Sequence, residues 1–246
     1  MTSISRHPPD ESPTPDDTRD EHLIVFARIP RLGEVKTRLA AGLGAEGALA
    51  AYRELLDHAL AQASACTGVT RWLCLSGEDP QGEGERLASR HRMRLSRQAP
   101  GDLGWRMRVA LRDCLARGRR AVLIGCDSPP IDAPLLRAAF DALRDRDLVF
   151  APTEDGGYAL VGARTDAGPI FSAIDWSTDR VMAQTRERAG QSGLSVAELP
   201  RIWDVDEPAD WQRFLDWRDR QTSAARGQTG ENPGRGGPVG QDAVGG

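Results

Sequence analysis

A single lysine, Lys36, stands among 31 arginines in this sequence of 246 residues. It belongs to a segment in which Gly33 lets the chain turn and in which four basic side chains gather: Arg28, Arg31, Lys36 and Arg38. An ammonium is a compact charge suited to phosphate oxygens, whereas a guanidinium is a planar fork. A helix is expected to follow, and its free N–H groups favour an anion. The segment therefore predicts a phosphate-binding loop without Walker A spacing, and a solvated basic loop is the alternative.

Carboxylates follow two further strands of the expected sheet. Asp127 comes after the apolar run Ala121–Gly125, where a carboxylate must be paired, hydrogen-bonded or bound to metal. Asp204 and Asp206 follow a later strand and project to the same side of an extended chain. Mg²⁺ (or Mn²⁺) held by one or two carboxylates plus substrate phosphates fits these positions. Two alternatives stay open: Asp127 or Ser128 begins a turn before the prolines, and Asp206 caps the helix expected from Pro208.

Glycines mark two other segments that follow strands. Gly101 and Gly104 open a helix after the third strand, where they fit either a backbone close to a ligand or ordinary loop chemistry. Asp155, Gly156 and Gly157 lie between two strands. Asp-Gly at such a place favours a structural hairpin, although two adjacent glycines also allow a ligand to approach the backbone.

The segment from Trp176 to Thr178 has two interpretations. It forms an acceptor-side lip of the site, or Ser177 or Thr178 caps the next helix beside a packed Trp176; the cap is favoured. No Ser-His-Asp set with a nucleophile elbow is present, and the four histidines do not cluster, so covalent catalysis is not indicated. His58 lies within an expected helix and is interpreted as structural.

Short apolar runs alternate with longer segments of helical period. Strands are expected near 23–27, 70–75, 93–97, 121–125, 148–151, 158–161 and 194–199. Helices are expected near 47–63, 103–116, 133–143, 178–189 and from Pro208. The alternation predicts a three-layer α/β/α domain with an open, mostly parallel sheet. Ligands of such sheets bind at the carboxyl ends of the strands, where the residues named above lie.

Charge and composition limit the class of protein. The net charge of −4 arises within residues 1–21, so the body is neutral and a broad nucleic-acid-binding face is not expected. The sequence predicts an acidic disordered tail (1–21), one domain (22–220) and a glycine-rich disordered tail (221–246). No apolar run spans a bilayer and no signal peptide is evident, which favours a cytoplasmic protein. Four cysteines are interpreted as buried free thiols in a reducing compartment: Cys66, Cys74, Cys114 and Cys126.

Six motifs in order resemble one protein family. They are F-A-R-I-P-R-L-G-E-V-K-T-R-L, D-L-G-W-R-M, I-G-C-D-S-P, E-D-G-G-Y-A-L-V-G, W-S-T and D-V-D-E-P-A-D, within about residues 22–216. The family comprises small bacterial transferases assigned as glycosyltransferases and often linked to radical-SAM and selenium-related genes. It is part of the nucleotide-diphospho-sugar transferase superfamily, which has the GT-A fold. K-T-R-L also resembles the opening of 2-phospholactate guanylyltransferases.

The resemblance implies roles for particular residues. Nucleotide phosphates would face Gly33, Lys36, Thr37 and Arg38, and the base or ribose would lie near Gly101, Asp102 and Gly104. A divalent ion would be held by Asp127 and Asp206. The sequence departs from the family at Arg28 and Leu32, where lysine and proline are usual, and it has Cys-Asp-Ser in place of a D-x-D motif at Asp127.

Together these observations predict a Mg²⁺-dependent transferase that binds a nucleotide sugar or a nucleoside triphosphate and a small-molecule acceptor. Asp127 and Asp206 would hold the ion, with Asp204 as a further candidate ligand, while Lys36 and Arg38 would neutralise phosphoryl charge. Asp155, Gly156, Gly157 and Trp176 would form the acceptor side. Nucleotidyl transfer is the closest alternative to glycosyl transfer, and a non-catalytic nucleotide-binding or partner-binding protein is the third.

Overall fold

The computed structural model describes residues 20–229, with side chains placed through residue 223. Its centre is a seven-stranded sheet of order β3-β2-β1-β4-β6-β5-β7. The strands are β1 (Glu21–Arg28), β2 (Thr70–Ser76), β3 (Arg94–Arg97), β4 (Arg120–Ile124), β5 (Leu148–Pro152), β6 (Tyr158–Ala163) and β7 (Val196–Glu198). Only β6 runs antiparallel to its neighbours, β4 and β5. The predicted mostly parallel sheet is confirmed.

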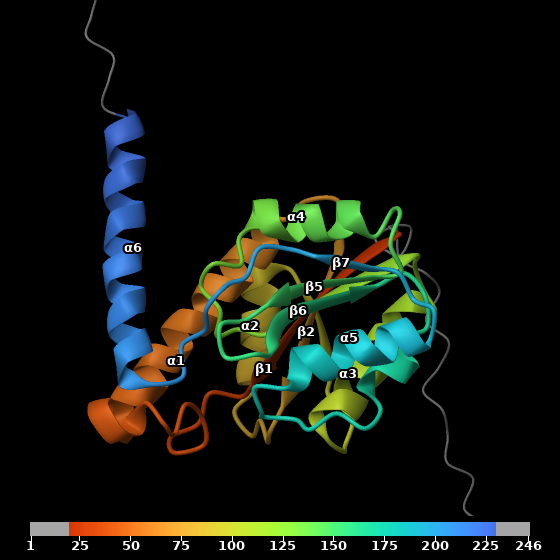
Figure 1. The fold of residues 1–246 in the computed structure, drawn as a ribbon. Coiled ribbons are helices and arrows are strands. Elements are labelled where there is room, and N and C mark those ends of the chain that lie inside the picture. Colours follow the sequence, from red (N-terminus) through yellow and green to blue (C-terminus); the bar gives the residue numbers. More distant parts are fainter. Residues whose placement is uncertain (1–19, 230–246) are drawn as a thin grey trace, which may run out of the picture.

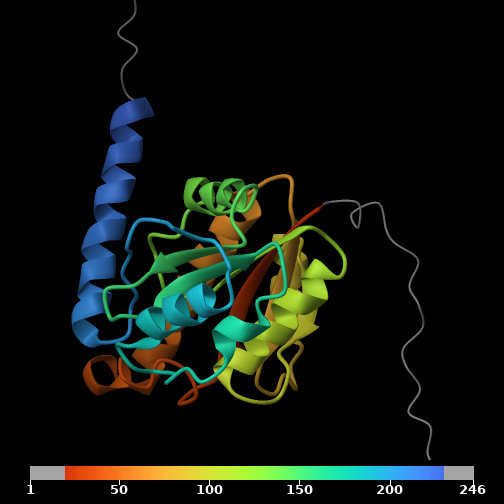
Figure 2. The same cartoon turned by 45° about the vertical axis from the view of Figure 1, so that its right-hand side comes forward.

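Helices cover both faces of the sheet (Figures 1 and 2). One face packs against α1 (Ala40–Ala65), α2 (Glu83–His91) and α4 (Ala133–Ala142). The other face packs against α3 (Leu103–Leu115), α5 (Val181–Gln191) and the 3₁₀ turn η2 (Gly168–Phe171). A last helix, α6 (Pro208–Thr229), lies outside this sandwich against α1, where Phe214 is buried in a third apolar cluster.

The central strand β4 shows why the sheet takes this form. Val122 and Ile124 are buried on the α1 and α4 side, whereas Ala121 and Leu123 are buried on the α3 and α5 side. A strand with both faces covered has no polar alternation, so its sequence reads as a continuous apolar run. Burial of each larger side chain contributes roughly 1.5–3 kcal/mol to folding. This packing fixes the end of β4, where the loop that contains Asp127 begins; this loop is called the acidic loop.

Two short elements have no counterpart in the sequence prediction, α2 and η2. Helix α2 has nine residues and only two buried apolar side chains, Leu87 and Ala88, so it offers too few apolar positions for a recurring pattern. Its start depends on the buried carboxylate of Asp79, which accepts hydrogen bonds from the backbone N–H groups of Glu83 and Gly84. Helix α1 also begins earlier than expected, at Ala40, and bends at Gly44, whose φ is +70°.

The ends of the predicted domain differ from the observed ends. Glu21, expected in the tail, begins β1, and its carboxylate pairs with Arg120 and Arg137. Helix α6 continues to Thr229, past the predicted end of the domain at 220. The rest of the two expected tails, 1–19 and 230–246, lies outside the described residues, so the three-part division stays a prediction. None of the helices within residues 20–229 is long and apolar enough to cross a membrane.

Candidate functional site

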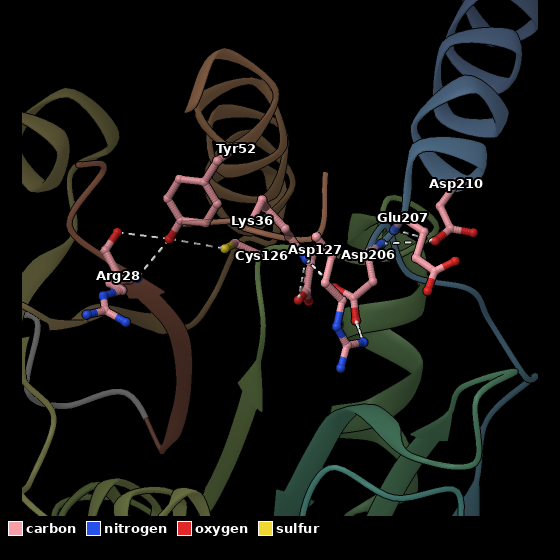
Figure 3. A network of polar contacts seen from close by, with 9 residues as sticks. Arg28, Lys36, Tyr52, Cys126, Asp127, Asp206, Glu207 and Asp210 are labelled. Atoms are coloured by element: carbon pink, nitrogen blue, oxygen red, sulfur yellow. Dashed lines mark hydrogen bonds and ion pairs between the residues drawn. The ribbon is translucent and has the colours of Figure 1, made fainter. Parts of the chain in front are cut away.

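Three residues far apart in the sequence meet at the carboxyl edge of the sheet (Figure 3). Lys36 follows β1, Asp127 follows β4 and Asp206 precedes α6. The ammonium of Lys36 donates to Oδ1 of Asp206 at 2.7 Å and to Oδ2 of Asp127 at 3.2 Å. Because β1 and β4 are parallel neighbours, their ends bring the basic loop and the acidic loop together. The structure thus joins the expected phosphate-binding residue to two of the expected metal ligands.

Lys36 is buried between its acidic partners. Its side chain is 9% exposed, whereas those of Asp127 and Asp206 are each 40% exposed. Burial by itself lowers the pKa of an ammonium, but the charges of Asp127 and Asp206 outweigh it, so the pKa of Lys36 lies above its ordinary value. The backbone of Lys36 has a φ of +45°, in the left-handed region that side chains other than glycine rarely adopt. The ammonium is therefore held in a specific place as a permanent charge.

Tyr52 of α1 holds the two loops in position. Its hydroxyl accepts a hydrogen bond from the backbone N–H of Arg28 at 2.8 Å and donates to the carbonyl of Arg28 at 2.9 Å. The thiol of Cys126, next to Asp127, donates to the same hydroxyl at 3.7 Å. Burial, with a contribution from Asp127, raises the pKa of Cys126 to about 12. Tyr52 therefore ties the end of β1 to the end of β4 (Figure 3).

A cleft of about 720 Å³ opens over the charged cluster, a volume typical of small-molecule sites. Thr37, Arg38, Asp155, Gly157 and Trp176 line it together with the Lys36 cluster. Arg38 is 70% exposed and its Nη1 lies 3.8 Å from Oδ2 of Asp206, so this ion pair is weak. Apolar side chains complete the lining: Val35, Leu103, Met107 and Val181. The cleft can therefore hold a ligand that has both anionic and apolar parts.

Asp204 lies in an adjoining cavity of about 250 Å³, whose lining includes Asp127, Ser128, Asp155 and Gly157. Burial and the nearby charges of Asp127, Asp155 and Asp206 raise the pKa of Asp204 to about 7. Asp127 lines both cavities, so it connects Asp204 with the Lys36 cluster.

The alternative in which Asp206 caps α6 is wrong. Its carboxylate faces Lys36 at 2.7 Å. The carboxylate of Asp210 instead accepts hydrogen bonds from the backbone N–H groups of Asp206 and Glu207, at 3.1 and 2.8 Å. Asp210 lies one turn into α6 and reaches back to the free N–H groups at its start, which leaves Asp206 available to bind a cation.

The donor set fits a divalent ion that is shared with a ligand. Asp127 and Asp206 already converge on one cation, the ammonium of Lys36. Mg²⁺ commonly takes one or two protein carboxylates and completes its shell with phosphate oxygens and water. Within residues 20–229, no group of three or more His, Cys, Asp or Glu side chains is arranged to hold a metal ion. The two carboxylates therefore suit an ion that arrives with phosphates.

The two glycines of the hairpin between β5 and β6 differ in role: Gly156 packs against backbone of the fold, whereas Gly157 faces the cavities. Gly156 has a φ of +89°, and a Cβ there would lie within 2.8 Å of the backbone Cα of Asp179. Oδ1 of Asp155 accepts hydrogen bonds from the Thr153 hydroxyl at 2.5 Å and from the Gly157 N–H at 3.1 Å. The expected Asp-Gly hairpin is confirmed, and Asp179 occupies the space beside Gly156 that a ligand would need. Gly157 lines both cavities.

The expected cap by Ser177 or Thr178 is wrong, because the N-cap of α5 is Arg180 and it has no side-chain cap. The Thr178 hydroxyl accepts a hydrogen bond from the N–H of Arg180 at 3.3 Å, but this N–H precedes the first residue of the helix. The Thr178 hydroxyl donates to the carbonyl of Asp175 at 2.8 Å, which closes the preceding turn. Ser177 has a φ of +64°, and Trp176 lines the cleft. The interpretation of His58 as a structural residue is confirmed, since its Nε2 contacts the carbonyl of Pro129 at 3.0 Å.

The remaining candidates lie at the start of α3 and in the basic loop. Asp102 is the N-cap of α3, because its carboxylate accepts a hydrogen bond from the N–H of Trp105 at 2.7 Å. Gly104 packs against the indole of Trp176, and a Cβ would come within 3.0 Å of three of its ring atoms. Gly101 and Gly33 have positive φ values of +124° and +75°. These contacts and backbone angles give each of the four residues a role in local structure, and their proposed roles in nucleotide binding stay predictions.

Sequence reasoning missed Tyr52 and the apolar lining residues. Tyr52 lies within the helix expected near 47–63, where it fits the apolar period like an ordinary core residue. The signal available was its hydroxyl, because a buried tyrosine needs a hydrogen-bond partner. Leu103 is 47% exposed at the first residue of α3, and Met107 follows one turn later. Nothing in the sequence pattern separates such cleft-lining positions from ordinary core positions of an amphipathic helix.

Comparisons with known proteins support the fold. Residues 59–178 match the family described as "Uncharacterized protein conserved in bacteria (DUF2064)", a range that contains Asp127 but neither Lys36 nor Asp206. No curated protein matches the chain. A crystal structure from Desulfovibrio desulfuricans G20, described as a "putative nucleotide-diphospho-sugar transferase", is 29% identical. The alignment covers 77% of this chain and 84% of that one, with a TM-score of 0.71.

Two more distant structures share the architecture. A nucleotidyl transferase from Methanothermobacter thermautotrophicus is 16% identical, with 82% of this chain and 98% of that chain covered and a TM-score of 0.60. CMP:2-keto-3-deoxy-manno-octonic acid synthetase in complex with CTP is 12% identical, with 82% and 99% covered and a TM-score of 0.55. The chain therefore has an α/β fold like that of nucleotide-diphospho-sugar transferases.

Proposed function

We propose that this protein is a divalent-metal-dependent transferase that binds a nucleotide sugar and transfers the glycosyl group to a small-molecule acceptor. The observation that carries the proposal is the meeting of Lys36, Asp127 and Asp206 at the carboxyl edge of the sheet, in a cleft of about 720 Å³. Two carboxylates and a buried ammonium provide what a metal-bound diphosphate needs, namely ligands for the ion and a cation for the phosphates. The description of the 29% identical protein agrees with this assignment.

Each residue has a defined task under the proposal. Asp127 and Asp206 hold the ion, which when bound neutralises charge on the leaving diphosphate. Lys36 and Arg38 contact phosphate oxygens, together with backbone groups of Gly33 and Thr37. The base or ribose lies near Gly101, Asp102 and Gly104. The acceptor side comprises Asp155, Gly157 and Trp176, with Gly156 fixing the hairpin that presents them.

The reaction requires no protein nucleophile. An acceptor oxygen forms the new bond to the anomeric carbon, while the bond from that carbon to the diphosphate breaks and its electron pair leaves with the nucleoside diphosphate. The proton of the acceptor passes to a carboxylate or to water. Holding both substrates in the cleft and neutralising the leaving group supply the rate enhancement.

One observation favours nucleotidyl transfer as the second candidate. Lys36 is the one lysine of the chain and is 9% exposed at the centre of the site, where a compact cation suits charge developing on a phosphoryl group. In that reaction a phosphate oxygen of a sugar phosphate attacks the α-phosphorus of a nucleoside triphosphate, and pyrophosphate leaves. The fold is shared with a synthetase that was crystallised with CTP.

Product analysis separates the candidates. A thermal-shift screen of nucleotides and nucleotide sugars with and without Mg²⁺ first identifies the donor, because a ligand that binds the folded state raises its stability. Released nucleoside diphosphate then supports glycosyl transfer, and released pyrophosphate supports nucleotidyl transfer. Asp127→Asn should abolish either product, and Asp132→Asn, which alters an N-cap of α4, is the matched control. Donor binding without any product, unchanged in Asp127→Asn, would instead identify a non-catalytic nucleotide-binding protein.

A further inference from the structure

We propose that the ammonium of Lys36 is the resident counter-ion of the metal site, and that a divalent ion reaches Asp127 and Asp206 together with a phosphate that takes the ammonium away. The inference rests on the proposed function, because it concerns how the same site loads its ligands. Metal and phosphate then bind cooperatively, and the free protein has low affinity for the metal alone.

The first step is the competition for oxygen lone pairs. Nζ of Lys36 lies 2.7 Å from Oδ1 of Asp206 and 3.2 Å from Oδ2 of Asp127. Mg²⁺ binds carboxylate oxygens at about 2.1 Å, so an ion shared by Asp127 and Asp206 competes with the ammonium for the same pair of carboxylates. A divalent ion beside a buried ammonium would also be repelled by a like charge that solvent screens weakly. The ammonium and the metal ion therefore exclude each other.

The second step is the charge that an arriving ion meets. With Lys36 in place, this three-residue cluster presents a net charge of −1, and without the ammonium it presents −2. Arg38 does not take over this task, because it is 70% exposed and lies 3.8 Å from Asp206. The affinity of the pair of carboxylates for a divalent ion therefore depends mainly on where the ammonium of Lys36 is.

The third step is the destination of the ammonium. Lys36 lines the cleft together with Arg28 and Arg38, so the cleft offers other cations beside which a phosphate can bind and attract the ammonium. Lys36 has a positive φ, so a strained backbone conformation positions its side chain. Backbone strain of this kind is concentrated at ligand clamps and switch regions. Once the ammonium turns to a phosphate, the carboxylates are free for the ion. Each ligand thereby removes the obstacle to the other, and this coupling is reciprocal.

Isothermal titration calorimetry of the full chain with Mg²⁺ tests the inference, with and without pyrophosphate at controlled free Mg²⁺. We expect pyrophosphate to raise the Mg²⁺ affinity of the wild-type protein at least about tenfold, within the usual range of coupling energies. Lys36→Met should bind Mg²⁺ alone at least about tenfold more tightly than wild type and should lose most of the gain from pyrophosphate. Arg28→Met is the matched control. It removes the same charge from the same cleft, but the guanidinium of Arg28 pairs with Glu34 and not with Asp127 or Asp206.

Two results would overturn the inference. One is a wild-type affinity for Mg²⁺ that does not change with pyrophosphate, a measurement that needs no variant. The other is a folded Lys36→Met protein with no gain in affinity for Mg²⁺ alone, or a gain equal to that of Arg28→Met. Circular dichroism checks folding, and Lys36→Gln replaces Lys36→Met if the apolar side chain prevents folding.

The same data separate this inference from the proposed function. Cooperative loading in the wild type with a gain in Lys36→Met, but no product from any donor, would leave the inference intact and reject the transferase. Product formation with an unchanged Mg²⁺ affinity in Lys36→Met would support the transferase and reject the inference.

Discussion

Replacing Gly156 by alanine tests whether the hairpin glycine serves folding or a ligand. Gly156 has a φ of +89°, and an added Cβ would lie 2.7 Å from the carbonyl carbon of Asp179 and 2.8 Å from its Cα. These neighbours are backbone atoms, so no side chain can move aside. The carbonyl of Gly156 also accepts a hydrogen bond from the N–H of Met182 at 2.9 Å, which attaches the hairpin to the first turn of α5.

Two penalties add in Gly156→Ala. A side chain in the left-handed region costs about 1–2 kcal/mol. Displacing packed backbone costs about 1–3 kcal/mol more, as in other overpacked sites. We therefore expect a loss of about 2–5 kcal/mol in the free energy of unfolding, and a fall in Tm of about 4–20 °C for a protein of this size.

Two other glycines provide graded controls. Gly193 has a φ of +67° with nothing within 4 Å of an added Cβ, so Gly193→Ala should cost only the backbone penalty of about 1–2 kcal/mol. Gly190 lies in α5 with open space and no positive φ, and alanine there should be neutral or should stabilise the protein by up to about 1 kcal/mol. Urea unfolding monitored by circular dichroism measures all three variants. A Gly156→Ala protein as stable as Gly193→Ala, but unable to bind donor or acceptor, would refute the structural role and restore a ligand role.

Three further outcomes are expected. Tyr52→Phe removes the hydroxyl that bonds both backbone groups of Arg28, so the free energy of unfolding should fall by about 1–3 kcal/mol; an unchanged urea midpoint would contradict the tie between the loops. The pKa of Asp204 in the folded state is about 7, above its ordinary value of 3.8, so between these pH values the folded state binds a proton that the unfolded state has lost. This proton stabilises the folded state, and its contribution to the free energy of unfolding is lost as the pH rises through 7. In EDTA, Asp204→Asn should therefore flatten the pH dependence of Tm between pH 4 and 7, and an unchanged slope would exclude Asp204 as its source. Burial raises the pKa of Cys114 and Cys126 to about 12, so both thiols should react with a disulfide reagent at pH 8 only after denaturation; rapid labelling of the native protein would disprove their burial.

The fold followed from the sequence wherever burial was strong. Strand β4 is apolar on both faces because it lies in the middle of the sheet, and the seven expected strands were all found. Helix α2 escaped prediction because it buries only a narrow face and because the carboxylate of Asp79, four residues before it, supplies its first hydrogen bonds. Periodicity detects a helix through apolar residues that recur over several turns, and a helix of nine residues with two buried apolar side chains offers too few of them.

The candidate site followed from the sequence only in part. Lys36 stood out by composition, and Asp127 by its place after an apolar strand. The sequence left open whether Asp206 caps a helix, because a carboxylate two residues before Pro208 suits both roles. The decision depends on Asp210, which reaches back to the same N–H groups, and on the distance of 2.7 Å from Asp206 to Lys36. Neither contact is visible in a linear pattern.

The sequence by itself determined the order along the chain of the seven strands and of every α-helix except α2, the edge of the sheet at which the polar loops gather, and the unusual identity of Lys36. These are properties of local composition and period, since they depend on residues within a few positions of one another. Only the tertiary structure decided that Lys36 faces Asp127 and Asp206, and that Tyr52 ties the loops from β1 and β4. Such contacts join positions separated by 24 to 170 residues, and they exist only after the sheet has aligned the ends of its strands.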